Sequence, residues 1–169
     1  IIAAQTAETF RWVWLVWLVP LFPAAATVLN GLLGRKVIRD RTGQIATFAM
    51  LGSLIVSLLC IWDIARTGQP YNVDYFTWIG VGDFQLPFGF YVDQLTAVML
   101  FVVSGVGTVI FLYAIGYMHG HPGYWRFFTY MPLFATMMFL LVLCNSLPVL
   151  FVGWEGVRLC SYLLIGYFF

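Results

Sequence analysis

The fold is decided by the stretch VDQLTAVMLFVVSGVGTVIFLYAIG, which runs from Val92 to Gly116. A helix needs about 20 apolar residues to cross a hydrocarbon core of about 30 Å. After Asp93 the stretch contains no charged residue, and Gly105 and Gly107 near its middle would let another helix approach closely. The stretch therefore predicts a transmembrane helix.

Four other segments approach the same length and apolar character, and they cover residues 12–33, 44–65, 127–143 and 147–169. The first carries Pro20 and Pro23, which free backbone carbonyls, a loss that neighbouring helices can repair in a membrane. We therefore expect an all-α integral membrane protein with about five transmembrane helices in one membrane domain, 1–169. Because the run 161–169 reaches the last residue without a polar stop, we also expect the chain to be part of a longer polypeptide.

The composition excludes other classes of protein. Of the 169 residues, 62% are hydrophobic and only 9% are charged, whereas soluble domains carry about 25% charged residues. So few charges cannot cover a water-facing surface, which excludes a soluble enzyme and a disordered segment. The net charge of +1 offers no nucleic-acid-binding surface. Three scattered cysteines, Cys60, Cys144 and Cys160, are interpreted as small hydrophobic residues.

The connecting segments predict the orientation. Residues 34–43 contain four basic residues and one acid, so the positive-inside rule places this loop in the cytoplasm or matrix. The amino terminus then lies outside, and the loop with His119 and His121 lies inside. The outer connection contains two aromatic-rich runs around a glycine turn, Gly80–Asp83, and predicts a β-hairpin over about 71–91. An exposed apolar hairpin of this kind usually docks on a neighbour.

Glu155 is the residue with the strongest chemical signal. It lies about 12 Å into the fifth segment, where an ionisable group costs about 3 kcal/mol and usually faces a bundle interior or a water path. Such carboxylates mark proton or ion pathways, but Glu155 could instead form a structural pair with Arg158, three residues on. Arg158 would favour the ionised carboxylate, or it could snorkel or bind a lipid headgroup.

Other polar residues have simpler interpretations. His119 and His121 are possible proton-entry groups or ordinary loop histidines, and no nearby Cys, Asp or Glu completes a metal shell. Asp93 is expected to cap the third helix, and Asp63 is expected to pair with Arg66. The sequence has no phosphate-binding loop, dinucleotide fingerprint or cysteine cluster, so we expect no cofactor, metal or redox centre in this chain.

Three runs together resemble the antiporter-like subunits of the proton-pumping NADH:quinone oxidoreductase, respiratory complex I, and in particular its subunit L branch. They are YVDQLTAVML (91–100), YAIGYMHGHPGY (113–124) and GWEG (153–156) with its continuation to Gly166. The resemblance covers about residues 74–169. It implies a fold with two inverted five-helix repeats after three initial helices, and a hairpin that contacts a neighbouring subunit.

The resemblance also implies a function. Glu155 would be a proton-channel residue that pairs with a lysine on a later helix, which this chain does not reach. FMN, iron–sulfur clusters and quinone would be bound by partner subunits, in a bacterial cytoplasmic or mitochondrial inner membrane. Arg158 stands where many relatives have a small residue, and our hypothesis is that it acts as a second, local counter-ion.

Three alternatives to this function remain. Two are related membrane subunits, the large subunit of a multisubunit sodium/proton antiporter and the membrane subunit of an energy-converting hydrogenase. The third alternative is a scaffold in which Glu155 and Arg158 form a static pair.

Overall fold

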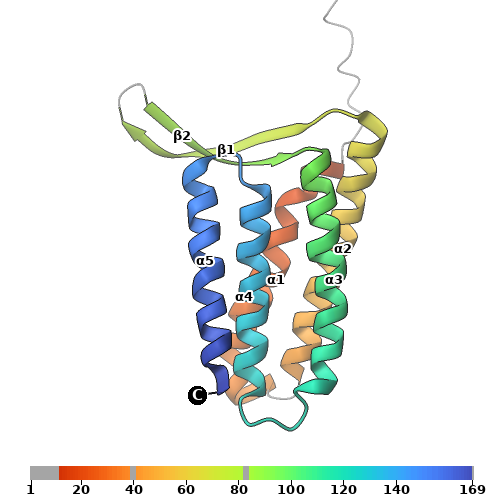
Figure 1. Ribbon diagram of the computed structural model, residues 1–169, viewed down its shortest axis with the longest axis vertical. Coiled ribbons are helices and arrows are strands. Elements are labelled where there is room, and N and C mark those ends of the chain that lie inside the picture. The colour runs from red at the N-terminus through yellow and green to blue at the C-terminus, as the bar shows by residue number, and fades with distance from the viewer. Residues whose placement is uncertain (1–11, 39–40, 82–83, 169) are drawn as a thin grey trace, which may run out of the picture.

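Five long apolar helices stand side by side, and a two-stranded hairpin lies across one end of them (Figure 1). The computed structural model describes residues 12–38, 41–81 and 84–168. The helices are α1 (Leu18–Leu33), α2 (Thr42–Thr67), α3 (Gln94–Tyr117), α4 (Tyr124–Leu143) and α5 (Leu147–Ile165), and short helical turns η1 (Trp12–Trp17), η2 (Gly34–Ile38) and η4 (Gly166–Phe168) extend α1 and α5.

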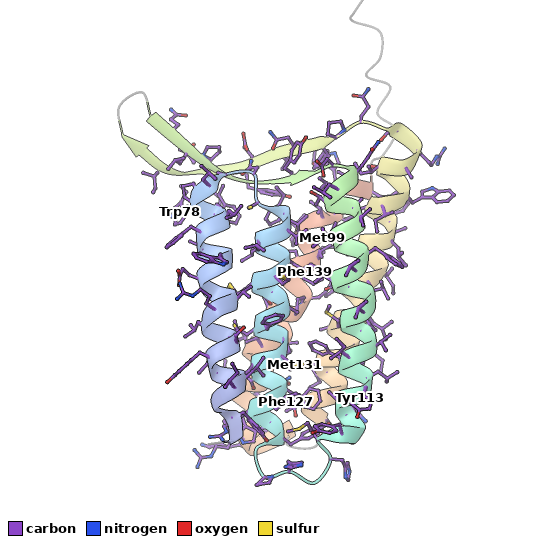
Figure 2. All side chains as sticks on the ribbon, in the orientation of Figure 1. Trp78, Met99, Tyr113, Phe127, Met131 and Phe139 are labelled. Carbon is purple, nitrogen blue, oxygen red and sulfur yellow. The ribbon has the colours of Figure 1, made fainter. Side chains whose placement is uncertain are left out.

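Each of the five helical segments is long and apolar enough to cross a membrane. The predicted fold class, five transmembrane helices with a hairpin between the second and third, is confirmed, and the bounds differ from the expected ones by a few residues. Figure 2 shows large apolar side chains along the whole molecule, from Trp78 on strand β1 of the hairpin to Phe127 and Tyr113 at the opposite end of the bundle. Many of them are exposed in this chain, Tyr113 by 69% and Trp78 by 46%, as expected for surfaces that contact lipid or other helices.

The proline of α1 shows how a neighbouring helix repairs the backbone. Pro23 lies inside α1 and has no N–H to donate to the carbonyl of Val19, four residues earlier. The hydroxyl of Ser53 on α2 donates to that carbonyl oxygen instead, at 2.8 Å, and both residues are fully buried. The predicted repair by a neighbour is therefore present, and it holds α1 against α2.

A second proline also leaves a backbone carbonyl that a side chain from a neighbouring helix pairs. Pro132 lies inside α4 and leaves the carbonyl of Phe128 without its helical donor. The side-chain amide of Asn30 on α1 donates to that oxygen at 2.7 Å, and it also donates to the carbonyl of Thr42 at 3.1 Å. Asn30 is fully buried, so one amide connects α1 to α4 and to the start of α2.

The hairpin consists of β1 (Tyr71–Val81) and β2 (Phe84–Val92), which pair antiparallel from Tyr71↔Val92 to Val81↔Phe84. This confirms the predicted hairpin; Gly82 and Asp83 of its expected turn lie outside the described residues. The α4–α5 linker holds the hairpin, because the amide of Asn145 donates to Asp74 Oδ1 at 2.5 Å. The hairpin thus closes one end of the bundle over α4 and α5.

The remaining expectations about single polar residues can be compared with the structure. The carboxylate of Asp93 caps α3, since its Oδ1 accepts from the N–H of Thr96 at 2.7 Å, as predicted. Asp63 is 8% exposed and accepts from the N–H of Val13 at 3.4 Å; its ion pair with Arg66 stays a prediction. The three cysteines carry no disulfide, and Cys60 and Cys160 are buried among apolar residues.

The basic η2 turn and the histidine loop lie at the end of the bundle opposite the hairpin. Arg35 of η2 and His119 and His121 of the α3–α4 loop line the same pocket. This arrangement agrees with the expected alternation of loops between the two ends; the side of the membrane on which each end lies stays a prediction. Arg39 and Asp40 of the basic loop, the amino-terminal residues 1–11 and Phe169 lie outside the described residues.

Candidate functional site

Glu155 is positioned by the way α5 packs on α4. The buried residues of α5, Val149, Gly153 and Cys160, are spaced i, i+4 and i+11 and lie on one helix face. A Cβ on Gly153 would lie 2.9 Å from the backbone nitrogen of Leu141 on α4. Only glycine therefore permits this approach of the two helices, and the approach fixes the rotation of α5.

Glu155 and Arg158 lie on the other side of α5. At about 100° per residue, Glu155 is turned by about 160° from Gly153. The Nη1 of Arg158 donates to Oε1 of Glu155 at 2.9 Å, and the guanidinium carbon lies 5.3 Å from the centre of the Trp154 ring. The two side chains are 42% (Glu155) and 61% (Arg158) exposed in this chain. The structural pair is thus formed, on a face that α4 does not cover.

The depth of the pair agrees with the sequence-based estimate. Glu155 lies about 12 Å along α5 from Leu147 and about 15 Å from Ile165, near the middle of the span. The expectation that Glu155 faces a bundle interior is not met by the described helices, which leave its face of α5 open. A covering surface for this carboxylate has to come from outside the described residues, and its role in a proton pathway stays a prediction.

The histidines form a separate group. His119 and His121 are exposed and line a pocket of about 500 Å³ together with Arg35. The end of α5 reaches this loop, because a Cβ on Gly123 would lie 2.5 Å from the Tyr167 hydroxyl. Tyr167 is 12 residues from Glu155 along the chain, which corresponds to about 18 Å along a helix. The structure therefore does not bring the histidines to the carboxylate.

Tyr167 is a titratable residue at the histidine end whose pKa is shifted. Burial raises the pKa of the Tyr167 hydroxyl, and the nearby Arg126 guanidinium, 5.8 Å from the ring centre, opposes this rise. Within the described ranges, no three His, Cys, Asp or Glu side chains come together as metal ligands would. The expectation of no metal and no cofactor stays a prediction.

Sequence reasoning missed two features of this structure. It did not single out Asn30 and Ser53, although a buried amide or hydroxyl in an apolar helix is a signal for a repaired proline. It also assigned Arg35 to the basic loop without grouping it with the histidines, although the positive-inside rule placed both loops on one side.

Comparison with known proteins relates the chain to one family. The family model described as "NADH-Ubiquinone oxidoreductase (complex I), chain 5 N-terminus" matches residues 78–128. NADH-quinone oxidoreductase subunit L of Neisseria meningitidis serogroup A is 36% identical over 154 residues, 90% of this chain and 23% of that protein. Subunit L of Escherichia coli is 44% identical over 119 residues, 70% of this chain and 19% of that protein.

A plastid protein is also similar. The chloroplastic NAD(P)H-quinone oxidoreductase subunit 5 of Mesostigma viride is 41% identical over 160 residues, 90% of this chain and 24% of that protein. The chain thus spans about a quarter of the length of the curated relatives that it matches.

Five apolar helices, the hairpin and these matches define the class: over most of its length the chain is similar to the antiporter-like membrane subunits of complex I. Within that class it is similar to an amino-terminal portion of subunit L of NADH-quinone oxidoreductase. The expected family is confirmed, and so is a multi-pass membrane protein.

Proposed function

We propose that this chain is part of a proton-translocating subunit of a respiratory NADH:quinone oxidoreductase, in which Glu155 is a group of the proton pathway. The supporting observation is the Glu155–Arg158 pair, near the middle of a transmembrane helix and on the face that α4 leaves open. A carboxylate at this depth costs about 3 kcal/mol. A helix that only packs against its neighbours has no need of such a group.

The proposed mechanism uses the charge balance around the carboxylate. The relatives are about four times as long as this chain, so further helices of the full protein are available to cover the open face of α5. Electron transfer elsewhere in the complex would shift the charges near Glu155 and alternate its proton affinity. Arg158 acts as a local counter-ion that holds the ionised state, while Trp154 keeps the guanidinium close to the helix.

The remaining parts of the proposal concern the surroundings of the chain. His119 and His121 serve as proton-entry groups at the inner end, and because they do not contact Glu155, water or polar groups must connect them to it. The chain itself holds no cofactor; FMN, iron–sulfur clusters and quinone belong to partner subunits of the complex. The membrane is a bacterial cytoplasmic or mitochondrial inner membrane, with the amino terminus outside.

The test compares three variants of the full-length protein in the assembled complex: Glu155→Gln, Arg158→Gln and the double variant. In sealed inside-out vesicles, NADH oxidation and the acidification of the lumen are measured together. We expect Glu155→Gln to lower the protons pumped per electron while oxidation continues in the presence of an uncoupler. Arg158→Gln is expected to change the pH profile of pumping.

The double variant distinguishes the scaffold alternative. Neutralising both partners removes a static pair without leaving an unpaired charge, so a scaffold would keep its pumping. Normal pumping per electron in the double variant would refute the proton-pathway role. Loss of pumping in both the single and the double glutamine variants supports it.

A further inference from the structure

A pocket lies at the histidine end of the bundle, between η2 and the α3–α4 loop. It has a volume of about 500 Å³, within the range of pockets that bind small molecules. Its lining residues come from η2, the loop and the first turn of α4, and they are Arg35, His119, Gly120, His121, Pro122, Tyr124 and Trp125.

The lining combines one guanidinium and two imidazoles with the side chains of a tyrosine and a tryptophan. Arg35, His119 and His121 can donate hydrogen bonds, and no lining residue is acidic. A guanidinium presents its N–H groups as a fork that matches the oxygens of a phosphate. The pocket is therefore built for an anion with several oxygens rather than for a cation or an apolar ligand.

The charge distribution of the bundle favours an anion at this end. Among the charged residues close in sequence to the lining residues, Lys36, Arg39, Arg41 and Arg126 are basic and Asp40 is acidic. The described aspartates instead lie near the hairpin, with Asp93 at its exit and Asp74 within it.

The location points to the membrane surface. The pocket lies just after the ends of α1 and α3 and at the first turn of α4, which is the terminal level of these three spans. Phospholipid headgroups occupy this level of a bilayer, and basic pockets between helices on the inner side are suited to anionic lipids. Tyr124 and Trp125 are aromatic residues of the kind enriched at this interface.

We propose that this pocket, called here the Arg35 pocket, binds an anionic phosphate group, the chemistry shared by the headgroup of an acidic phospholipid and a free phosphate ion. The guanidinium of Arg35 and the imidazoles of His119 and His121 contact the phosphate oxygens. The proposal does not depend on proton translocation, because it concerns binding alone.

The experiment uses the assembled complex with the full-length protein in lipid nanodiscs. The probe is a phosphatidylglycerol with a photoreactive group beside its phosphate, and mass spectrometry locates the label. We expect labelling within residues 119–126. The triple variant Arg35→Gln/His119→Gln/His121→Gln should lower it at least about tenfold, as expected when one charge-assisted hydrogen bond is lost. Unchanged labelling in the triple variant would overturn the proposal.

Two further variants separate recognition from folding. Lys36→Gln removes the neighbouring charge without touching the pocket lining, and it should leave labelling within about twofold of the unmodified protein, a change of less than about 0.5 kcal/mol. Arg35→Lys keeps the charge and should retain labelling that Arg35→Gln loses. If Lys36→Gln lowered the labelling as much as the triple variant does, diffuse surface charge would explain the binding, and the proposed phosphate site in the pocket would be overturned.

Competition identifies the source of the phosphate. Loss of the label in excess inorganic phosphate supports a site for the free ion. Labelling that resists inorganic phosphate, and that a phosphatidylcholine probe does not reproduce, supports the acidic headgroup. Equal labelling by the zwitterionic phosphatidylcholine probe contradicts recognition of an anionic group.

Discussion

Removing the hydroxyl of Ser53 should weaken the α1–α2 contact because it leaves the backbone carbonyl of Val19 without a hydrogen-bond donor. Pro23 cannot donate to the oxygen of Val19, and the Ser53 hydroxyl takes over at 2.8 Å. Both residues are 0% exposed, so lipid and water cannot replace the donor. Ser53→Ala removes only one oxygen atom and leaves no large cavity. The change in the free energy of unfolding therefore measures the loss of the hydrogen bond.

The expected cost follows from the buried carbonyl. Side-chain hydrogen bonds between membrane helices contribute about 0.6 kcal/mol on average and up to about 1.7 kcal/mol, and a buried acceptor left unpaired costs about 1–3 kcal/mol. We expect Ser53→Ala to lower the free energy of unfolding by about 1–2 kcal/mol. In a Pro23→Ala background the helix regains its own N–H donor, and the same substitution should cost less than about 0.5 kcal/mol.

The assay is unfolding of the full-length protein by added SDS in mixed micelles, followed by circular dichroism. Ser57→Ala is the matched control, because Ser57 is also fully buried on α2 and its hydroxyl has no hydrogen-bond partner among the described residues. The control should be neutral or slightly stabilising. Equal costs for Ser53→Ala and Ser57→Ala, or the same cost of Ser53→Ala in both backgrounds, would refute the reasoning.

Three other predictions concern separate parts of the fold. Asp93→Ala should lower the free energy of unfolding by about 1 kcal/mol, because the N–H of Thr96 loses its cap, while Asp93→Asn should cost little; SDS unfolding compares them. Gly153→Ala should cost about 1–3 kcal/mol by overpacking against the Leu141 backbone, partly offset by about 1 kcal/mol of helix propensity. Gly116→Ala, with no atom within 4 Å of the added Cβ, is its control and should not destabilise. Asn145→Ala removes the hydrogen bond to Asp74 and should speed proteolysis within the hairpin, which Asn72→Ala should affect less because its contact with Asn145 is longer, 3.3 Å against 2.5 Å.

The sequence predicted what depends on local pattern. Long charge-free runs predicted the helices, aromatic runs around a glycine turn predicted the hairpin, and the position of Asp93 at the start of the third run predicted the cap. The contacts that join Asn30 to Phe128 and Ser53 to Val19 could not be predicted, because they depend on which helices become neighbours. A proline indicates that a carbonyl will need a donor, but not where the donor will come from.

The direction in which Glu155 points was predictable only in part, and the reason lies in the packing of α5. Its spacing of three residues from Arg158 was enough to expect the pair, which the structure contains at 2.9 Å. The side of α5 on which Glu155 lies depends on Gly153. Because Gly153 lets α4 approach closely, its side of α5 packs on α4 and the carboxylate lies on the opposite side. The described bundle is thus complete on the α4 side of α5 and open on the charged side. The proposed pathway requires further helices on the open face, and a full-length structure with an apolar, lipid-exposed environment there would contradict the proposed role.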